Sequence, residues 1–214
     1  MIIDCISDMH GEFPELKGGD LLIIAGDFTS NDTELAWSHF ISWLINQKYE
    51  KKILVAGNHD NKCTKWTLPQ DNELRKRSLS YLCDSGTEFR GLKIWGSPWS
   101  LSFEGINPHC TAFTGTEFEI QKHLDKIPED TDILITHMPP WGILDQNKKG
   151  LNCGHRGLRN MLISDAFPNL KFHVFGHIHE CGGNVLNTTC RTFINASIMN
   201  EDYEAVNEPI RIVL

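Results

Sequence analysis

The chain of 214 residues lacks any apolar run long enough to cross a membrane. A membrane helix needs about 20 consecutive apolar residues, and the longest apolar run here, Leu21–Ala25, has only the length of a strand. The 17 glycines and 9 prolines are scattered without a period, which excludes collagen-like repeats and low-complexity linkers. Since no repeat or linker divides the chain, we expect one globular domain over residues 1–214 and no membrane segment.

The cysteines lack the spacing of a metal site or a disulfide framework. There are 7 of them, an odd number, and none forms a C-x-x-C pair. The first residues, Met1 to Cys5, have neither the basic nor the long apolar region of a secretory signal. We therefore expect reduced cysteines and a cytoplasmic protein.

Positive charge is scarce, since 20 Lys and Arg stand against 28 Asp and Glu and give a net charge of -8. Binding to a nucleic-acid backbone requires many phosphates to be neutralised, so we expect no polynucleotide partner. A small phosphate ligand is not excluded, because a local positive centre such as a bound metal pair can hold it. The composition leaves the oligomeric state open.

Short apolar segments bounded by turn residues predict β-strands. These segments are 1–7, 21–25, 53–56, 92–95, 133–136, 173–175, 192–195 and 210–213. Helical periodicity predicts helices at 33–48, 116–126 and 157–166. In the first of them an apolar face is shared by Leu35, Ala36, Phe40, Trp43 and Leu44. This order predicts a layered α/β fold, in which two mixed β-sheets pack face to face with helices outside.

Polar side chains follow five of the predicted strands directly. The segments are Ser7–Gly11, Gly26–Thr29, Gly57–Asp60, Thr136–Pro140 and Gly176–Glu180. Loops at the carboxyl ends of strands bind ligands in α/β sheets, so we expect these Asp, Asn and His residues to converge. One such residue would indicate an ordinary turn, whereas five in succession indicate a metal site. Mixed oxygen and imidazole ligands suit Mn, Fe, Zn or Co better than Ca.

These segments match the pattern D-x-H, G-D, G-N-H-[DE], H and G-H-x-H. With it the chain resembles the calcineurin-like metallophosphoesterases, whose layered fold agrees with the predicted one. A narrower similarity, to the metallophosphoesterase domain-containing or class III phosphodiesterase-like branch, rests on 26–29, 91–99, 136–140, 144–145, 173–180 and 193–197.

The resemblance implies two divalent metal ions, with Mn or Fe favoured and Zn or Co as alternatives. One metal would be held by Asp8, His10, Asp27 and His179, and the other by Asp27, Asn58, His137 and His177. Asp27 would bridge the two metals, and a hydroxide between them would attack phosphorus. His59 would protonate the leaving oxygen without binding a metal, and Asp60 would either orient His59 or stabilise the turn.

The sequence after the third segment favours a diester substrate over a monoester. Protein phosphatases of the superfamily place an Arg soon after this motif, and the dianion of a monoester needs such a cation. Here the following residues are 61–65, Asn-Lys-Cys-Thr-Lys. A lysine supplies a point charge but no bidentate fork.

Several aromatic and basic residues near the motifs are candidate substrate contacts, namely Phe13, Trp99, Trp141, His155 and Arg156. Aromatic faces stack on bases, although tryptophans beside proline can also serve only to pack loops. We predict a dimetal phosphodiesterase acting on a small nucleotide-type diester such as a cyclic nucleotide. The alternatives are a phosphomonoesterase and a nucleotide-binding or scaffold protein with residual activity.

Overall fold

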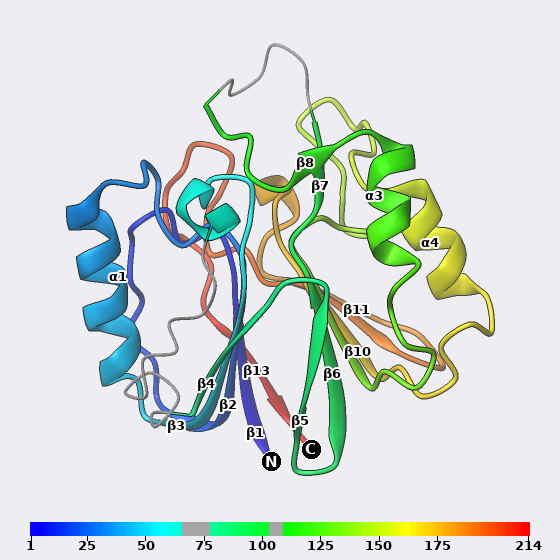
Figure 1. Cartoon of the computed structure of the whole chain (residues 1–214), viewed down its shortest axis with the longest axis horizontal. Coiled ribbons are helices and arrows are strands. Elements are labelled where there is room, and N and C mark those ends of the chain that lie inside the picture. Colours follow the sequence, from blue (N-terminus) through cyan, green and yellow to red (C-terminus); the bar gives the residue numbers. More distant parts are fainter. Residues whose placement is uncertain (66–77, 103–108) are drawn as a thin grey trace.

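Two mixed β-sheets form the centre of the computed structural model, which describes residues 1–65, 78–102 and 109–214 (Figure 1). The first sheet has the order β13 (Ile210–Val213), β1 (Ile2–Ile6), β2 (Gly19–Ala25), β3 (Tyr49–Val55), β4 (Leu79–Leu82). The second has the order β11 (Asn184–Asn187), β12 (Thr192–Asn195), β10 (Phe172–Phe175), β9 (Ile133–Thr136), β6 (Leu92–Ser97), β5 (Ser85–Phe89). β7 (Ser100–Leu101) and β8 (Thr114–Gly115) pair separately.

Most neighbouring strands in both sheets are parallel, and the antiparallel pairs lie at the edges. β1, β2, β3 and β4 run parallel while β13 runs antiparallel to β1. In the second sheet β6, β9, β10 and β12 run parallel, and β5 and β11 are antiparallel edges. The predicted pair of mixed sheets is confirmed.

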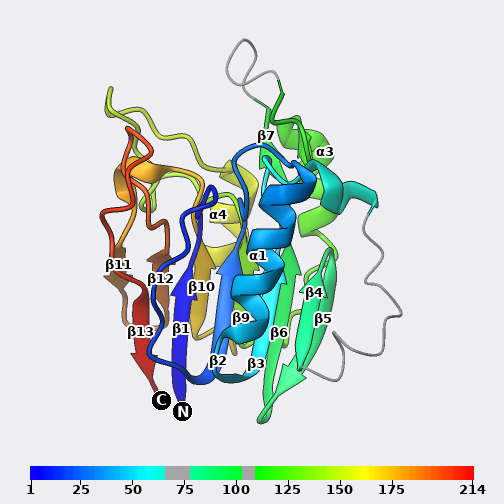
Figure 2. The same ribbon diagram turned by 90° about the vertical axis from the view of Figure 1, so that its left-hand side faces the viewer.

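Helices cover the outer faces of the two sheets. α1 (Glu34–Asn46) lies over the first sheet, and α3 (Glu117–Leu124) and α4 (Arg156–Ile163) lie on the opposite side of the molecule (Figures 1 and 2). Short 3-10 helices follow β3 and β10, at Asn61–Lys65 and His179–Cys181. All three predicted helices are present, each a few residues shorter than expected.

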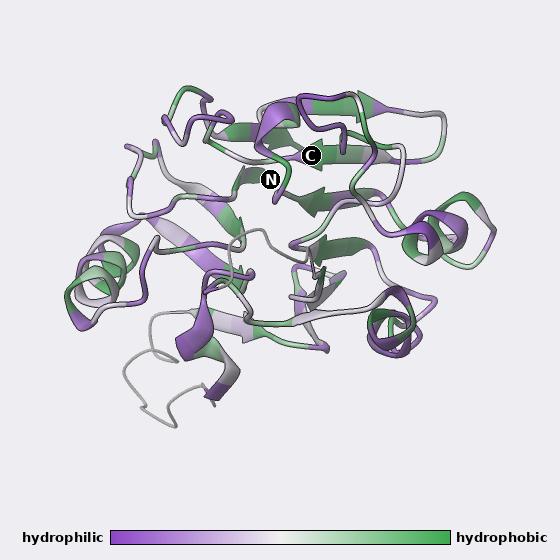
Figure 3. Cartoon of the chain, turned by 90° about the horizontal axis from the view of Figure 1, so that it is seen from above, coloured by the Kyte–Doolittle hydropathy of each residue, from purple (hydrophilic) through white to green (hydrophobic). Residues whose placement is uncertain are grey.

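The apolar side chains form three layers, one between the sheets and one beneath the helices on each side. β2 shows how a strand serves two of them, because Leu21 and Ile23 belong to the layer between the sheets, while Leu22 and Ile24 belong to the layer under α1. Such alternation is the period of two expected of a strand. Seen from above, the strands are largely hydrophobic and each helix alternates in hydropathy (Figure 3).

The face of α1 differs from the predicted one at its first turn. Trp37, Phe40 and Leu44 are buried, whereas Leu35 is 65% exposed. The helix begins after its N-cap, where the Thr33 hydroxyl accepts a hydrogen bond from the Ala36 N–H. Residues three or four apart share a helix face. Leu35 is two positions from Trp37 and five from Phe40, so its side chain points away from the buried face.

Five strands among the described residues were not predicted, and most are too short or too polar to give an apolar signal. β11 is exposed at all of its positions, and β5 has alternating half-buried and exposed residues that end at Phe89. β7 and β8 have only two residues each. Among the described residues, no helix has the length and apolarity needed to cross a membrane.

Candidate metal centre

The predicted ligands meet at one end of the molecule, where the parallel strands of both sheets finish. β1, β2 and β3 lead into Asp8, Asp27 and Asn58, and β9 and β10 lead into His137 and His177. These loops lie at the upper end of Figure 1, opposite the two termini. The topology alone therefore brings residues from 8 to 179 together.

Four of these residues have left-handed backbone conformations, which are unusual for residues other than glycine. The φ angles are 52° for Asp8, 45° for His10, 56° for Asp27 and 70° for His177. Hydrogen bonds between loops hold two of these turns, from the Asp8 N–H to the Gly26 carbonyl (2.9 Å) and from the His10 N–H to the Asp27 carbonyl (3.1 Å). Uncommon backbone conformations at converging polar residues are a feature of functional sites.

Asp27 lies at the middle of the cluster. Its Oδ2 is 3.3 Å from His137 Nε2, 3.7 Å from His10 Nε2 and 4.0 Å from His59 Nε2. Asp27 itself is 2% exposed. One carboxylate oxygen thus faces histidines that follow three different strands, as a residue shared by two metals would.

Asp8, His10 and His179 form the first ligand group. His179 Nε2 lies 3.4 Å from Asp8 Oδ1 and 3.3 Å from His10 Nε2. The other ring nitrogen of His10, Nδ1, is buried and has no hydrogen-bond partner among the described residues. Ring nitrogens that face each other beside a carboxylate are the donor set of a divalent transition metal.

Asn58, His137 and His177 lie on the other side of Asp27. Asn58 Oδ1 is 3.0 Å from His137 Nε2, and the Nδ1 of His137 is 2.8 Å from the Ala25 carbonyl. A carbonyl at Nδ1 fixes the ring and leaves Nε2 for a metal. His177 packs edge-on against His137, with ring centroids 4.9 Å apart, and the His177 backbone N–H donates to both oxygens of Asp8.

The electrostatics of the site prepare most of the ligands for a cation. Although burial opposes ionisation, His179 holds the pKa of Asp8 below its usual range and His137 does the same for Asp27. Burial lowers the pKa of His10 to about 4, so this ring is neutral at pH 7. Asp27 raises the pKa of His137 to about 9 against the effect of burial. Metal binding then displaces a proton, and metal affinity decreases as the pH is lowered.

The residues therefore fit a pair of divalent metal ions. Asp8, His10 and His179 have ligand atoms within 4.8 Å of one another, and so do Asp8, Asp27 and His137. Carboxylates, imidazoles and one amide oxygen are ligands of borderline metals. The individual ligand roles remain predictions.

His59 lies beside this cluster with its side chain 10% exposed. Its backbone N–H donates to Asp27 Oδ1 (2.9 Å), and its ring packs edge-on against His10 with centroids 4.6 Å apart. His10, Asp27 and His59 also have ligand atoms within 4.8 Å of one another. The geometry thus allows a metal ligand, a phosphate contact or a proton donor, and the proton donation stays a prediction.

Asp60 stabilises the turns that carry Asp27 and Asn58. Its carboxylate accepts hydrogen bonds from the N–H groups of Asp27 (2.9 Å), Phe28 (2.9 Å) and Gly57 (2.8 Å). Burial and the Asp27 carboxylate raise the pKa of Asp60 well above its usual range. Of the two predicted roles, turn stabilisation is the one for which the structure supplies contacts.

Gly57 lets the β3 loop approach Asp27 closely. A Cβ at this position would lie 2.2 Å from Asp27 Oδ1 and 2.7 Å from the Asp27 backbone nitrogen. We expect Gly57→Ala to displace Asp27, to lower metal content below that of the wild type, and to destabilise the fold by about 1 to 3 kcal/mol. Metal analysis by mass spectrometry and thermal unfolding measure the two effects.

Gly115→Ala is the matched control, since its Cβ would meet only side-chain atoms, of Glu119 at 3.3 Å and of Ile120 at 3.7 Å. Neither glycine has a positive φ, so the comparison isolates the steric effect. Equal metal content in the two variants would show that the approach of Gly57 to Asp27 is unimportant.

Two residues of the site were missed by the sequence analysis. The Tyr203 ring packs edge-on against His10 and His179, with centroids 4.9 and 4.8 Å away. Cys110 contacts His59, with Sγ 3.2 Å from Nδ1. Both belong to loops outside the five motif segments, and no local spacing marks either residue.

Trp141 and Arg156 form a cationic aromatic group beyond the His137 loop. The guanidinium carbons of Arg156 and Arg159 lie 5.0 and 5.5 Å from the Trp141 ring centroid. Neither arginine makes an ion pair within the part of the chain that the structure describes. The predicted contact of Trp141 and Arg156 with substrate stays a prediction.

The other three candidate substrate residues have structural contacts. Phe13 stacks on Trp43 of α1 at 5.5 Å. Trp99 stacks on His123 at 3.7 Å and donates its indole N–H to Asp84 (3.2 Å), which is the packing alternative. His155 is 1% exposed and caps α4 by accepting a hydrogen bond from the Leu158 N–H. These contacts show how the three side chains pack, and the predicted contact of Phe13, Trp99 and His155 with substrate stays a prediction.

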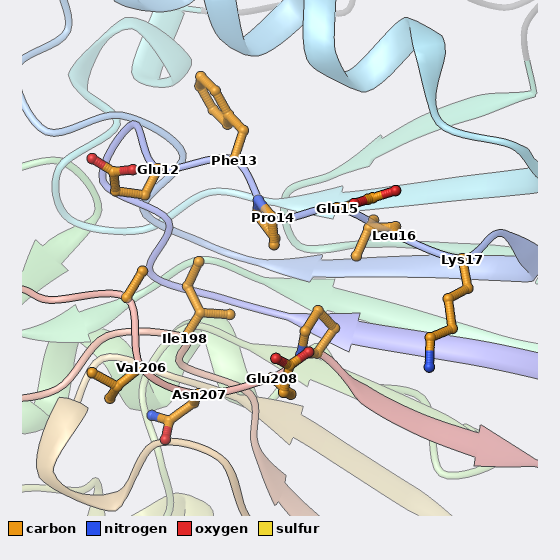
Figure 4. A pocket seen from close by; sticks show the side chains of 12 residues that line it. Glu12, Phe13, Pro14, Glu15, Leu16, Lys17, Ile198, Val206, Asn207 and Glu208 are labelled. Carbon is orange, nitrogen blue, oxygen red and sulfur yellow. The ribbon is translucent and has the colours of Figure 1, made fainter.

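A groove of about 600 Å³ lies between residues 12–17 and the segment from 198 to 209 (Figure 4). Phe13 lines it and points toward α1. The charged lining residues are Glu12, Glu15, Glu208 and Lys17, so negative groups outnumber positive ones. This charge repels a phosphate ester, and the groove is therefore unsuitable as its binding site.

The chain matches the family model described as calcineurin-like phosphoesterase over residues 1–181. Human metallophosphoesterase domain-containing protein 1 is 36% identical over 234 residues, covering 98% of this chain and 70% of the human protein. The mouse protein of the same name has the same identity and coverage. The fold and site define a metal-dependent phosphoesterase. The chain belongs to the calcineurin-like phosphoesterase family.

Solved structures confirm the fold at low sequence identity. The protein TT1561 of Thermus thermophilus gives a TM-score of 0.62 at 14% identity, covering 91% of this chain and 88% of that one. Phosphopantetheinyl hydrolase from Mycobacterium tuberculosis gives 0.54 at 17%, covering 97% and 95%. A dimetal phosphatase from Danio rerio gives 0.51 at 11%, covering 91% and 86%.

Proposed function

We propose that this phosphoesterase hydrolyses a small phosphodiester of the nucleotide type, such as a cyclic nucleotide, with His59 as general acid. The observation that carries the proposal is the convergence of Asp8, Asp27 and the histidines, with no arginine in the residues 61–65 that follow the third motif. When bound, two metal ions would supply positive charge for the phosphate and a water activated for attack. Asp8, His10, Asp27 and His179 would hold one of them, and Asp27, Asn58, His137 and His177 the other.

The environment of Lys62 supports a diester substrate. Lys62, the first basic residue after His59, forms an ion pair with Glu34 at the start of α1. The Glu34 carboxylate partly neutralises its charge. A monoester dianion carries one more negative charge than a diester and gains most from an arginine fork. A diester needs less of this compensation.

The cluster of Trp141, Arg156 and Arg159 supports a substrate that carries a base as well as a phosphate. Trp141 follows the His137 loop directly, and its backbone N–H donates to the His155 carbonyl (3.1 Å) at the start of α4. That bond fixes the Trp141 backbone, and the indole ring centroid lies 5.0 Å from the Arg156 guanidinium carbon. Guanidinium and indole groups together recognise phosphates and bases, and the two arginines add local positive charge to an otherwise acidic chain.

His59 would contribute the proton for the leaving oxygen. Its Nε2 faces Asp27 in the centre of the cluster, and a general acid must lie within hydrogen-bond reach of the atom that it protonates. A ribose alkoxide has a high pKa, so its departure depends on such a proton. The ring position is therefore suited to a nucleotide diester.

The test is turnover of a substrate panel by the metal-stripped chain before and after Mn is added. We expect no turnover in excess chelator, recovery with Mn, and a higher kcat/KM for bis(p-nitrophenyl) phosphate than for p-nitrophenyl phosphate. The 2',3'- and 3',5'-cyclic nucleotides should also be hydrolysed. Full activity in chelator would contradict the metal centre.

The same panel decides between the alternatives. A preference for p-nitrophenyl phosphate would favour a phosphomonoesterase. Tight binding of a nucleoside monophosphate, with little turnover of any ester, would favour a nucleotide-binding protein. Metal analysis on the same samples should find close to two ions per chain.

A further inference from the structure

Cys110 lies at one edge of the His59 ring, and the predicted metal ligand Asp27 lies at the other. Cys110 Sγ lies 3.2 Å from Nδ1, while Nε2 lies 4.0 Å from Asp27 Oδ2. The two nitrogens of an imidazole differ in role, and the partner of one determines what the other presents. A fixed contact at Nδ1 therefore orients Nε2.

The segment that carries Cys110 is built against the His59 turn. The Ala112 N–H donates to the Asn58 carbonyl (3.2 Å), and the Asn61 side-chain amide donates to the His109 carbonyl (3.3 Å). Ala112 is buried beneath α1 together with Phe113. Two hydrogen bonds and an apolar anchor thus hold the backbone on both sides of Cys110.

We propose that Cys110 is a positioning residue for His59, holding the ring so that Nε2 faces the leaving oxygen. This inference rests on the proposed function, in which His59 acts as general acid. When the P–O bond breaks, its electron pair stays on the leaving oxygen and the Nε2 proton moves to that oxygen. The remaining ring proton is at Nδ1, next to Cys110 Sγ. The cysteine is neither oxidised nor consumed.

The thiol is suited to positioning and poorly suited to nucleophilic attack. Burial, Asp27 and Asp32 raise the pKa of Cys110, so the sulfur stays protonated at neutral pH. A nucleophilic cysteine needs the thiolate. A neutral thiol, in contrast, can donate or accept a weak hydrogen bond and so can contact Nδ1.

Leaving-group dependence tests the proposal. We expect Cys110→Ala to slow hydrolysis of a cyclic nucleotide on the order of tenfold, as loss of an orienting partner does. Hydrolysis of bis(p-nitrophenyl) phosphate should change little, because p-nitrophenolate leaves without a proton. Cys110→Ser should recover most of the loss, since its hydroxyl can also donate and accept. Cys190→Ala, at an exposed cysteine, should match the wild type on both esters.

A second measurement does not depend on activity. In the metal-free protein, the ring ¹⁵N shifts of His59, assigned with His59→Asn, should move at Nδ1 in Cys110→Ala and less in Cys110→Ser. Wild-type rates of Cys110→Ala on the cyclic nucleotide would overturn the proposal, and so would equal losses on both esters. If the wild type hydrolyses neither diester, the proposed function fails, and unchanged His59 shifts would then overturn the positioning role separately.

Discussion

Asp27→Asn is expected to lose both metal ions and to lower kcat/KM for every phosphodiester by more than about 100-fold. Loss of a residue that only supports a metal ligand costs up to about 100-fold, and loss of a ligand itself should cost more. Asp27 Oδ2 is the atom that faces His10, His59 and His137 together. An amide keeps the size of the side chain and removes its charge. Two cations would then lose the anion between them. Metal analysis and steady-state kinetics in Mn measure both effects.

Asn58→Ala is the informative comparison, because Asn58 is predicted to bind only one metal and contributes no charge. We expect it to retain the metal held by Asp8, His10 and His179. Circular dichroism should show that both variants remain folded. Two bound metals and wild-type turnover in Asp27→Asn would contradict the bridging role.

The arrangement of the candidate metal centre could be predicted because each motif directly follows a strand. The carboxyl ends of parallel strands meet at one edge of each sheet, and the layer between the sheets brings both edges together. Asp8 and His137 thus meet although 128 residues separate them in the sequence. Strand order and local pattern contained this information, and side-chain detail was unnecessary.

The positions of the aromatic residues could not be predicted in this way. Phe13 follows His10 by three residues, but the turn between them, closed by a hydrogen bond from the Glu12 N–H to the Met9 carbonyl (2.7 Å), directs the chain toward α1. Trp99 has an indole N–H that needs a partner when buried, and it finds Asp84. Proximity in sequence to a motif does not fix the direction of a side chain.

Tyr203 and Cys110 lie far from the motifs in sequence and yet contact the site. Tyr203 reaches His10 and His179 from a loop near the end of the chain, and Cys110 reaches His59 from a loop 51 residues away. Tertiary contacts alone bring them there. The edge strand β11 was missed for a related reason, since its exposed side chains do not produce an apolar pattern.

His59→Asn is expected to retain both metals and to lose about 100- to 10,000-fold in turnover of a cyclic nucleotide, the usual contribution of a general acid. The same variant should lose little on bis(p-nitrophenyl) phosphate. A general acid helps in proportion to the basicity of the leaving oxygen. A ribose alkoxide is far more basic than p-nitrophenolate, so only the first needs the Nε2 proton. Rates for both esters and metal content are measured on the same preparation.

The outcome separates the three roles that the geometry of His59 allows. Its Nε2 is 4.0 Å from Asp27 Oδ2, close enough for a metal ligand, a phosphate contact or a proton donor. Loss of a metal in His59→Asn would make it a ligand. Equal losses on both esters with metals intact would make it a phosphate contact. Only a loss confined to the poor leaving group identifies the proton donor, because no other role depends on the pKa of the departing oxygen.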